Sequence, residues 1–234
     1  MQTTLLLAAC FTIATTASAQ DLSGVWLLQD PNGTFSKAPP PPMTAFGVER
    51  FTANKPTIGA SAALDANDPT VDCVPPGVPY ILVIPTPFEF VQRPGQVIQL
   101  FEYSHFVRRI HTDGRTHPAT LHDTGSHEWL GHSIGWWEGD TFVIDTIGFN
   151  DQTWLDRLGH PHSDALHVVE RIRSADAEIL EYDITIRDPK VYTAVWQGRL
   201  LFKRRPGWEI GEHTCVARED ANYLEFKRRA WQPK

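Results

Sequence analysis

The stretch GHSIGWWEGDTFVIDTIGFNDQTWLDRLGHPHSDALHVVER, from Gly131 to Arg171, decides how we interpret the fold. Its apolar residues alternate with polar ones on both sides of the turn at Gly139 and Asp140, as expected for two strands of a hairpin. Asp145 and Glu170 nevertheless fall on strand faces that are otherwise apolar, with Val143, Ile147, Leu166, Val168 and Ile172. A carboxylate on an apolar face is costly to bury unless it is paired or functional. The stretch therefore predicts the wall and rim of a binding cavity.

Strand patterns continue on both sides of this stretch. Residues 179–187 alternate cleanly between apolar and polar side chains, which is typical of a strand with one buried and one solvated face. No long amphipathic helix is visible. The expected strands are residues 22–26, 88–92, 97–103, 106–112, 133–138, 141–148, 167–173, 179–187, 192–204 and 209–216. Many strands joined mostly by short turns predict an all-β protein, a single antiparallel up-and-down barrel with a Pro-rich N-terminal extension.

The chain of 234 residues fits one barrel domain preceded by a targeting segment. Residues 1–19 are expected to be a signal peptide, because an apolar run from Leu5 to Ala14 precedes the small residues Ala17, Ser18 and Ala19. Cys10 offers an alternative, a lipoprotein signal in which this cysteine is lipidated. Residues 20–70 would hold the first strand and the Pro-rich extension, with Pro39 to Pro42 consecutive, and residues 71–234 the remainder of the barrel.

Export and charge limit the classes of partner. A cleaved signal predicts a periplasmic or secreted protein with no membrane association after cleavage, since no other stretch approaches the length of an apolar span. The net charge of −7 provides no basic field for nucleic acid. The remaining cysteines, Cys73 and Cys215, are expected to form one disulfide in an oxidising compartment, although two separate buried thiols are the other possibility. Such a bond would close a loop of about 140 residues, worth roughly 4–5 kcal/mol in the chain-entropy model.

Two sets of motifs carry a family resemblance. Gly24-Val25-Trp26, near the start of a barrel pattern, resembles the opening of lipocalins and calycins. The chain between about residues 70 and 220 also resembles a widespread family of uncharacterised exported bacterial proteins. The resemblance implies a shared fold and pocket but no particular activity. Its blocks are Cys73-Val-Pro-Pro-Gly77, Arg109-Ile-His-Thr-Asp-Gly-Arg115, His117-Pro118, Gly131-His-Ser-Ile-Gly135, Trp137-Glu-Gly-Asp140, Asp145-Thr146, Gly148-Phe149, Pro161-His-Ser163 and Glu170-Arg171.

Acid–base chemistry is the leading functional hypothesis. His132 precedes a strand, where a loop presents an imidazole, and histidine titrates near neutrality. Asp145 or Glu170 could orient it or, when buried, act as a general acid. The expected catalytic residues are His132, Asp145, His162 and Glu170, and the expected substrate-binding residues are Arg109, Asp113, Arg115, His117, Trp137 and Trp154. This set predicts a cofactor-independent isomerase, lyase, hydratase or hydrolase acting on a small hydrophobic or aromatic molecule.

Three alternatives remain open from the sequence. The carboxylates could form structural ion pairs with Arg108, Arg109 or Arg171, and Asp113 could simply be neutralised by its arginine neighbours. The barrel could be a non-catalytic carrier of a small ligand. A zinc-dependent hydrolase is the third, with His160, His162 and His167 as candidate ligands. Three imidazoles that converge on one point would favour zinc, whereas a histidine–carboxylate contact would favour acid–base catalysis.

Overall fold

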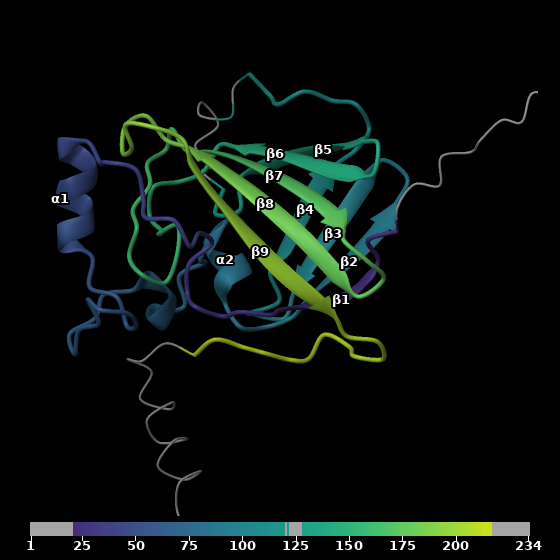
Figure 1. The fold of residues 1–234 in the computed structure, drawn as a ribbon, viewed down its shortest axis with the longest axis horizontal. Helices are drawn as coiled ribbons and strands as arrows, with labels where there is room; N and C mark the ends of the chain where they lie inside the picture. The colour runs from purple at the N-terminus through teal and green to yellow at the C-terminus, as the bar shows by residue number, and fades with distance from the viewer. Residues whose placement is uncertain (1–20, 120, 122–127, 217–234) are drawn as a thin grey trace, which may run out of the picture.

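The computed structural model describes residues 21–119, 121 and 128–216, and in this part nine strands close into one barrel (Figure 1). Neighbouring strands in the barrel follow the order of the chain, and β1 closes the barrel by pairing with β9. The strands are β1 (Gly24–Leu28), β2 (Phe88–Arg93), β3 (Gln96–Phe101), β4 (Val107–His111), β5 (His132–Glu138), β6 (Thr141–Ile147), β7 (His167–Ser174), β8 (Ile179–Arg187) and β9 (Trp196–Arg204).

One pair of strands departs from the predicted antiparallel meander. β4 and β5 run parallel and share only two residue pairs, Ile110 with Ser133 and His111 with Ile134. A tight turn cannot connect parallel neighbours, so the chain must leave the barrel and return to the level at which it left. Residues 112–119 begin this connection on the β5–β6 side of the barrel (Figure 1), and residues 128–131 lead into β5. The barrel is therefore mixed, and the prediction of a purely antiparallel barrel is wrong.

The interior of the barrel is packed with aromatic and branched side chains. Phe88 lies at its centre, with ring centroids 5.0 Å from Phe202, 5.2 Å from Phe90 and 6.3 Å from Tyr182. These rings meet at steep angles, an arrangement that aromatic pairs prefer. Strand alternation supplies them: Leu180, Tyr182, Ile184 and Ile186 of β8 are all at most 1% exposed, while their neighbours face outward. Small eight- or nine-strand barrels are just wide enough for side chains to fill.

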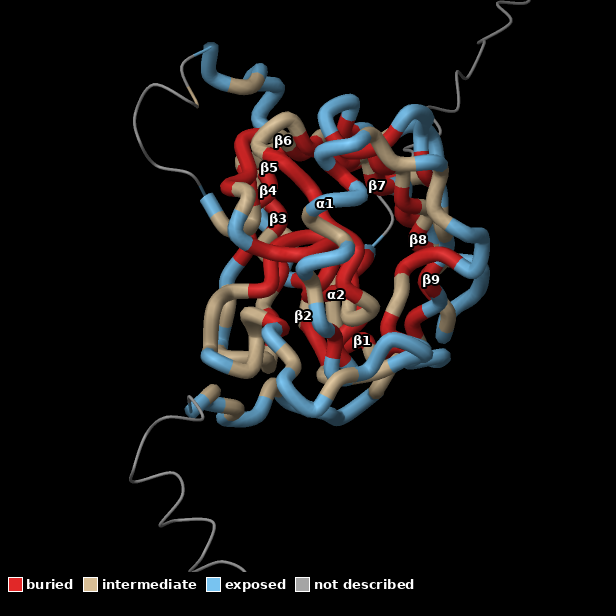
Figure 2. Tube along the Cα trace, turned by 90° about the vertical axis from the view of Figure 1, so that its left-hand side faces the viewer, coloured by how far each residue is buried: buried red, intermediate tan, exposed pale blue. Residues whose placement is uncertain are grey.

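Helices and irregular segments cover one end of the barrel. Figure 2 looks onto this end, where α1 (Ala45–Ala53) and α2 (Tyr80–Val83) lie in front of the strands. All four residues of α2 are buried, so this short helix plugs the opening. A 3₁₀ helix, η1 (Pro69–Asp72), follows α1. In the described part of the chain, no helix is long and apolar enough to cross a membrane.

The predicted disulfide is present. Cys73 and Cys215 are bonded, with their Cα atoms 5.6 Å apart. The bond links the segment after β9 to the residue that ends η1. That segment is not the strand expected at residues 209–216, because its only ladder contact among the described residues is an isolated bridge between His213 and Tyr103. The predicted signal peptide and Cys10 lie outside the described residues.

Candidate functional site

Glu170 projects into the barrel interior and is neutralised there. Arg108 donates two hydrogen bonds to its carboxylate, Nη1 to Oε1 at 3.0 Å and Nη2 to Oε2 at 2.5 Å, and both side chains are at most 1% exposed. The guanidinium also donates to Ser133 Oγ at 3.0 Å and to Thr146 Oγ1 at 2.8 Å. A paired and hydrogen-bonded charge is the form in which a carboxylate can be buried. Glu170 is therefore an interior ion-pair residue, as the structural alternative with Arg108 anticipated.

Asp145 lies on the opposite face of the same barrel wall. On β6, Phe142, Ile144 and Thr146 face the interior, so Asp145 faces outward, where its side chain is 23% exposed. Two imidazoles share its Oδ1 atom: Nε2 of His167 lies 2.9 Å away and Nε2 of His117 lies 3.0 Å away. His167 opens β7, whereas His117 comes from the long connection between β4 and β5. The connection that makes the barrel mixed thus also completes this cluster.

His132 extends the cluster by one more imidazole. Its Nδ1 atom lies 2.9 Å from Nδ1 of His117, and its ring stacks near that of His111, with centroids 5.3 Å apart. We call His117, His132, Asp145 and His167 the outer-wall relay. Among the described residues His132 does not hydrogen-bond directly to Asp145 or Glu170; His117 lies between His132 and Asp145.

The hydrogen bonds of the relay define its tautomers. A carboxylate accepts hydrogen bonds only, so Nε2 of His117 donates to Asp145. In neutral His117 the other nitrogen, Nδ1, then accepts, and the hydrogen between the two rings belongs to Nδ1 of His132. Nε2 of His132 consequently carries a lone pair, and no described residue hydrogen-bonds to it. The relay ends in a neutral imidazole nitrogen that can accept a proton.

Electrostatics favour this protonation pattern. Burial raises the pKa of Asp145, but hydrogen bonds from His167 and His117 and the electrostatic interactions with these rings outweigh it, and the pKa lies below its ordinary value of 3.8. Burial, together with the charges of His117, His111 and Arg115, lowers the pKa of His132 below 6.5. Asp145 is therefore ionised and His132 neutral at neutral pH.

The loop after β4 adds positive charge beside the relay. Arg115 grips Asp113 through Nε and Nη2, and these hydrogen bonds lower the pKa of Asp113 to about 2. The structure thus pairs Asp113 with Arg115, as the ion-pair alternative anticipated. Burial and the charges of Arg115 and Arg109 lower the pKa of His111, which places both guanidinium groups within electrostatic range of the histidines.

The three histidines proposed as zinc ligands have separate partners. His160 Nδ1 lies 2.8 Å from Oδ2 of Asp156, His162 Nε2 lies 2.7 Å from Oγ1 of Thr153, and His167 contacts Asp145. Over residues 21–119, 121 and 128–216, no group of three or more His, Cys, Asp or Glu side chains is arranged to hold a metal ion. The structure does not bring His160, His162 and His167 to one point.

Among the other predicted residues, Arg109 is exposed, Trp137 is partly buried, and His162 and Trp154 are buried. His162 is 2% exposed, and burial lowers its pKa, so it is a buried neutral hydrogen-bonding group. Trp137 packs on Phe142, with ring centroids 5.1 Å apart, and Trp154 is 6% exposed within the apolar cluster. In the structure, both indoles pack with the apolar residues of the core.

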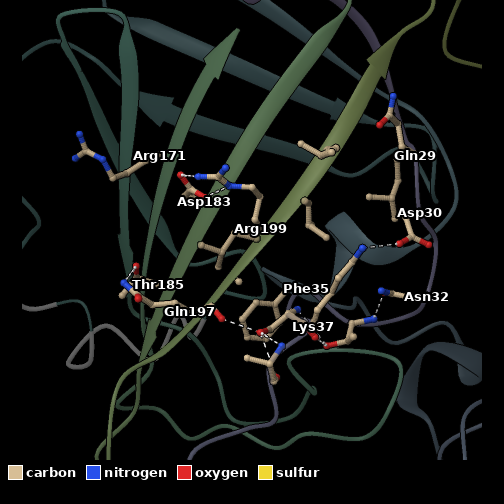
Figure 3. A pocket seen from close by; sticks show the side chains of 18 residues that line it. Gln29, Asp30, Asn32, Phe35, Lys37, Arg171, Asp183, Thr185, Gln197 and Arg199 are labelled. Atoms are coloured by element: carbon tan, nitrogen blue, oxygen red, sulfur yellow. Dashed lines mark hydrogen bonds and ion pairs between the residues drawn. The ribbon is translucent and has the colours of Figure 1, made fainter. Parts of the chain in front are cut away.

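A groove of about 720 Å³ lies between residues 29–38 and strands β8 and β9 (Figure 3). β1 pairs with β9 only as far as Leu28 and Phe202, so β9 residues 197–201 border this segment instead of another strand. Outward-facing side chains from three strands line the groove, and its charges are paired, for example Arg199 with Asp183 and Lys37 with Asp30. This groove is outside the barrel, whereas the predicted cavity was inside it.

Two contacts were not expected from the sequence. The bond between His117 and His132 joins residues 15 apart, one from the segment after β4 and one at the start of β5. Asp156 and His160 form a buried pair with i,i+4 spacing, a pattern visible in the sequence but not recognised there.

In comparisons with known proteins, no protein-family model and no curated protein matches the sequence.

Proposed function

We propose that the protein is an acid–base enzyme in which Nε2 of His132 is the general base. The supporting observation is the continuous chain of hydrogen bonds from Asp145 through His117 to His132. Asp145 fixes the tautomer of His117, and His117 in turn fixes the tautomer of His132. When His132 accepts a proton at Nε2, it becomes an imidazolium whose Nδ1–H donates toward His117, and the carboxylate of Asp145 stabilises the added charge.

The surroundings of the relay suit an uncharged, apolar substrate. Across the sheet, Asp145 pairs with Ile134 and Val169, and His132 pairs with Ile147, so branched aliphatic residues lie between the polar groups on the outer face. Arg115 adds a positive charge nearby. A neutral base beside a guanidinium suits removal of a proton from carbon or water, since the guanidinium stabilises the anion that forms. The proposed reaction classes are therefore isomerisation, elimination or hydration, and hydrolysis of a small hydrophobic or aromatic molecule.

Export and a lipocalin-like ancestry belong to the same proposal. The Cys73–Cys215 disulfide accords with an oxidising compartment such as a periplasm or the cell exterior. A closed barrel that begins with Gly24-Val25-Trp26 accords with a calycin-like architecture, with the parallel β4–β5 pair as a departure from it.

A carrier function is the second candidate, and the groove of about 720 Å³ beside β9 favours it. Its volume is in the range that small-molecule sites occupy. A carrier would retain a ligand through purification and show no turnover. Native mass spectrometry of the full exported chain, followed by identification of any bound small molecule, measures this directly.

The catalytic proposal is tested with 5-nitrobenzisoxazole, an aromatic probe for an oriented base. Transfer of its C3 proton to Nε2 of His132 breaks the N–O bond and releases a coloured cyanonitrophenolate. We expect the protein to exceed free imidazole at equal concentration by at least tenfold, His132→Ala to abolish the excess, and the rate to rise with pH around a midpoint below 6.5, in line with the lowered pKa of His132.

His105→Asn provides the matched control. His105 lies on a different loop, hydrogen-bonds to the carbonyl of Gly211 and has a positive φ that asparagine tolerates. This variant should retain the full rate. Equal rates for His132→Ala and the unmodified protein would overturn the proposal.

A further inference from the structure

A second histidine–carboxylate pair lies at the barrel end covered by α1, away from the strands that carry the relay. Both oxygens of Asp156 contact Nδ1 of His160, at 2.8 and 2.9 Å, and Asp156 is fully buried. The same carboxylate accepts a hydrogen bond from the backbone N–H of Leu158 at 3.0 Å. Asp156 therefore holds the imidazole in the Nδ1–H tautomer, which leaves a lone pair on Nε2.

Aromatic contacts immobilise the His160 ring. Phe51 of α1 stacks on one face, with centroids 5.1 Å apart and planes 6° from parallel, and Trp196 meets the ring edge-on at 4.9 Å. Among the described residues, Nε2 of His160 has no hydrogen-bond partner. A fixed ring with one free acceptor is preorganised to bind a donor group, because the imidazole side chain loses little conformational entropy when the donor binds.

Trp196 contributes an unused donor at the same place. Its side chain is buried, and its indole Nε1–H has no hydrogen-bond partner among the described residues. Buried N–H groups are rarely left unsatisfied, since an unmade hydrogen bond leaves the cost of desolvating the donor uncompensated. A partner that is not part of the described chain would remove this cost.

The residues His160 and Trp196 both line one pocket. We call it the end groove, a space of about 510 Å³ that shares its wall of residues 32–38 with the larger groove of Figure 3. Pro39, Pro40 and Leu158 supply apolar surface beside the indole of Trp196. Apolar residues in one pocket with an imidazole acceptor and an indole donor match a ring that carries a hydroxyl group.

We propose that the end groove binds a small hydroxylated aromatic molecule, whose O–H donates to Nε2 of His160 and accepts from Nε1–H of Trp196. A hydroxyl is the simplest group that can do both. This site is separate from the outer-wall relay, and its ligand need not be the relay's substrate.

The experiment compares phenol with anisole, in which the hydroxyl hydrogen is replaced by methyl. Phenol should shift the indole N–H signal of Trp196 in a ¹H–¹⁵N spectrum of the full chain, with assignment by Trp196→Phe. Anisole has nearly the same ring but cannot donate, so we expect at least tenfold weaker binding. Equal affinities for the two compounds would overturn the proposal.

Two further measurements keep the test independent of folding. Ala38→Phe introduces a ring at an exposed position of the end groove without touching Asp156 or His160, and it should reduce phenol affinity at least tenfold. Unchanged phenol affinity in this variant would place the binding elsewhere and contradict the proposal. Methyl glucoside tests hydroxyls on a non-aromatic ring, and tighter binding of this sugar than of phenol would reject the aromatic class.

Discussion

Glu170 and Asp145 lie in neighbouring residue pairs of the β6–β7 ladder, yet they have opposite fates. Ile144 pairs with Glu170, and the next pair joins Asp145 to Val169. A step of one residue reverses the face of a strand, so Glu170 enters the interior and Asp145 the outer surface. Inside, one guanidinium binds both carboxylate oxygens. Outside, two imidazoles share a single oxygen. Both oxygens of Glu170 are occupied by the buried ion pair with Arg108, whereas Asp145 orients two imidazole rings at the outer surface.

The largest effect should come from the interior. Glu170→Gln leaves the guanidinium of Arg108 buried without a counter-charge, and breaking a buried pair in this way costs about 3–5 kcal/mol. Urea unfolding followed by tryptophan fluorescence measures the loss. The double variant Arg108→Met with Glu170→Met removes both charges and should lose much less, since apolar replacement of a buried pair is often nearly neutral. A double variant as unstable as the single one would show that the ion pair itself stabilises the barrel.

Asp145→Asn should reduce stability less than Glu170→Gln does, but it should change the tautomers of His117 and His132. The side chain is partly exposed, so we expect a loss of about 1 kcal/mol. The amide can donate as well as accept, and His117 is then no longer held as the Nε2–H form. Long-range ¹H–¹⁵N spectra distinguish the tautomers: His132 should be Nδ1–H in the unmodified protein and a mixture in the variant. A Nε2–H form of His132 in the unmodified protein would refute the relay.

A pH dependence of stability follows from His132. Its pKa in the folded protein lies below the ordinary 6.5, so the unfolded chain binds more protons at this residue as the pH falls. Stability contributed by the neutral ring is present above pH 6.5 and is lost as the pH falls below that value. His132→Gln should therefore lose less stability between pH 7 and pH 5 than the unmodified protein, in paired urea titrations. A steeper loss in the variant would mean that the pKa of His132 is raised instead.

The smallest effect is expected at the exposed pair near the relay. Asp113 and Arg115 are hydrogen-bonded as closely as Glu170 and Arg108, but solvent screens their charges. Asp113→Asn should leave the urea midpoint unchanged within error. Arg115→Gln should raise the pKa of His132, because it removes one of the charges that lower it. An NMR titration of the His132 ring measures this shift, and no change would place the Arg115 charge out of range.

Local patterns anticipated much of the sheet and part of the site. Period-2 alternation located eight of the nine strands closely, and the expected first strand overlaps β1. Alternation also placed Asp145 with Val143 and Ile147, but it could not decide which face points inward, since Val143 is buried although it faces outward. The parallel β4–β5 pair was missed because a parallel pairing leaves no turn signal in the sequence.

By itself, the sequence located the nine strands approximately, favoured the pairing of Cys73 with Cys215 and showed that histidines and carboxylates gather in one region of the sheet. These follow from short-range periodicity and from the number of cysteines. Only the tertiary structure decided that Glu170 meets Arg108, that His117 returns over the outer wall to join Asp145 and His132, and that Asp156 fixes His160 in the end groove. Closure of the barrel sets the inner face of every strand. The placement of the segment that follows β4 sets which side chains lie above the outer face of β5 and β6. Both depend on contacts between residues that are distant in sequence.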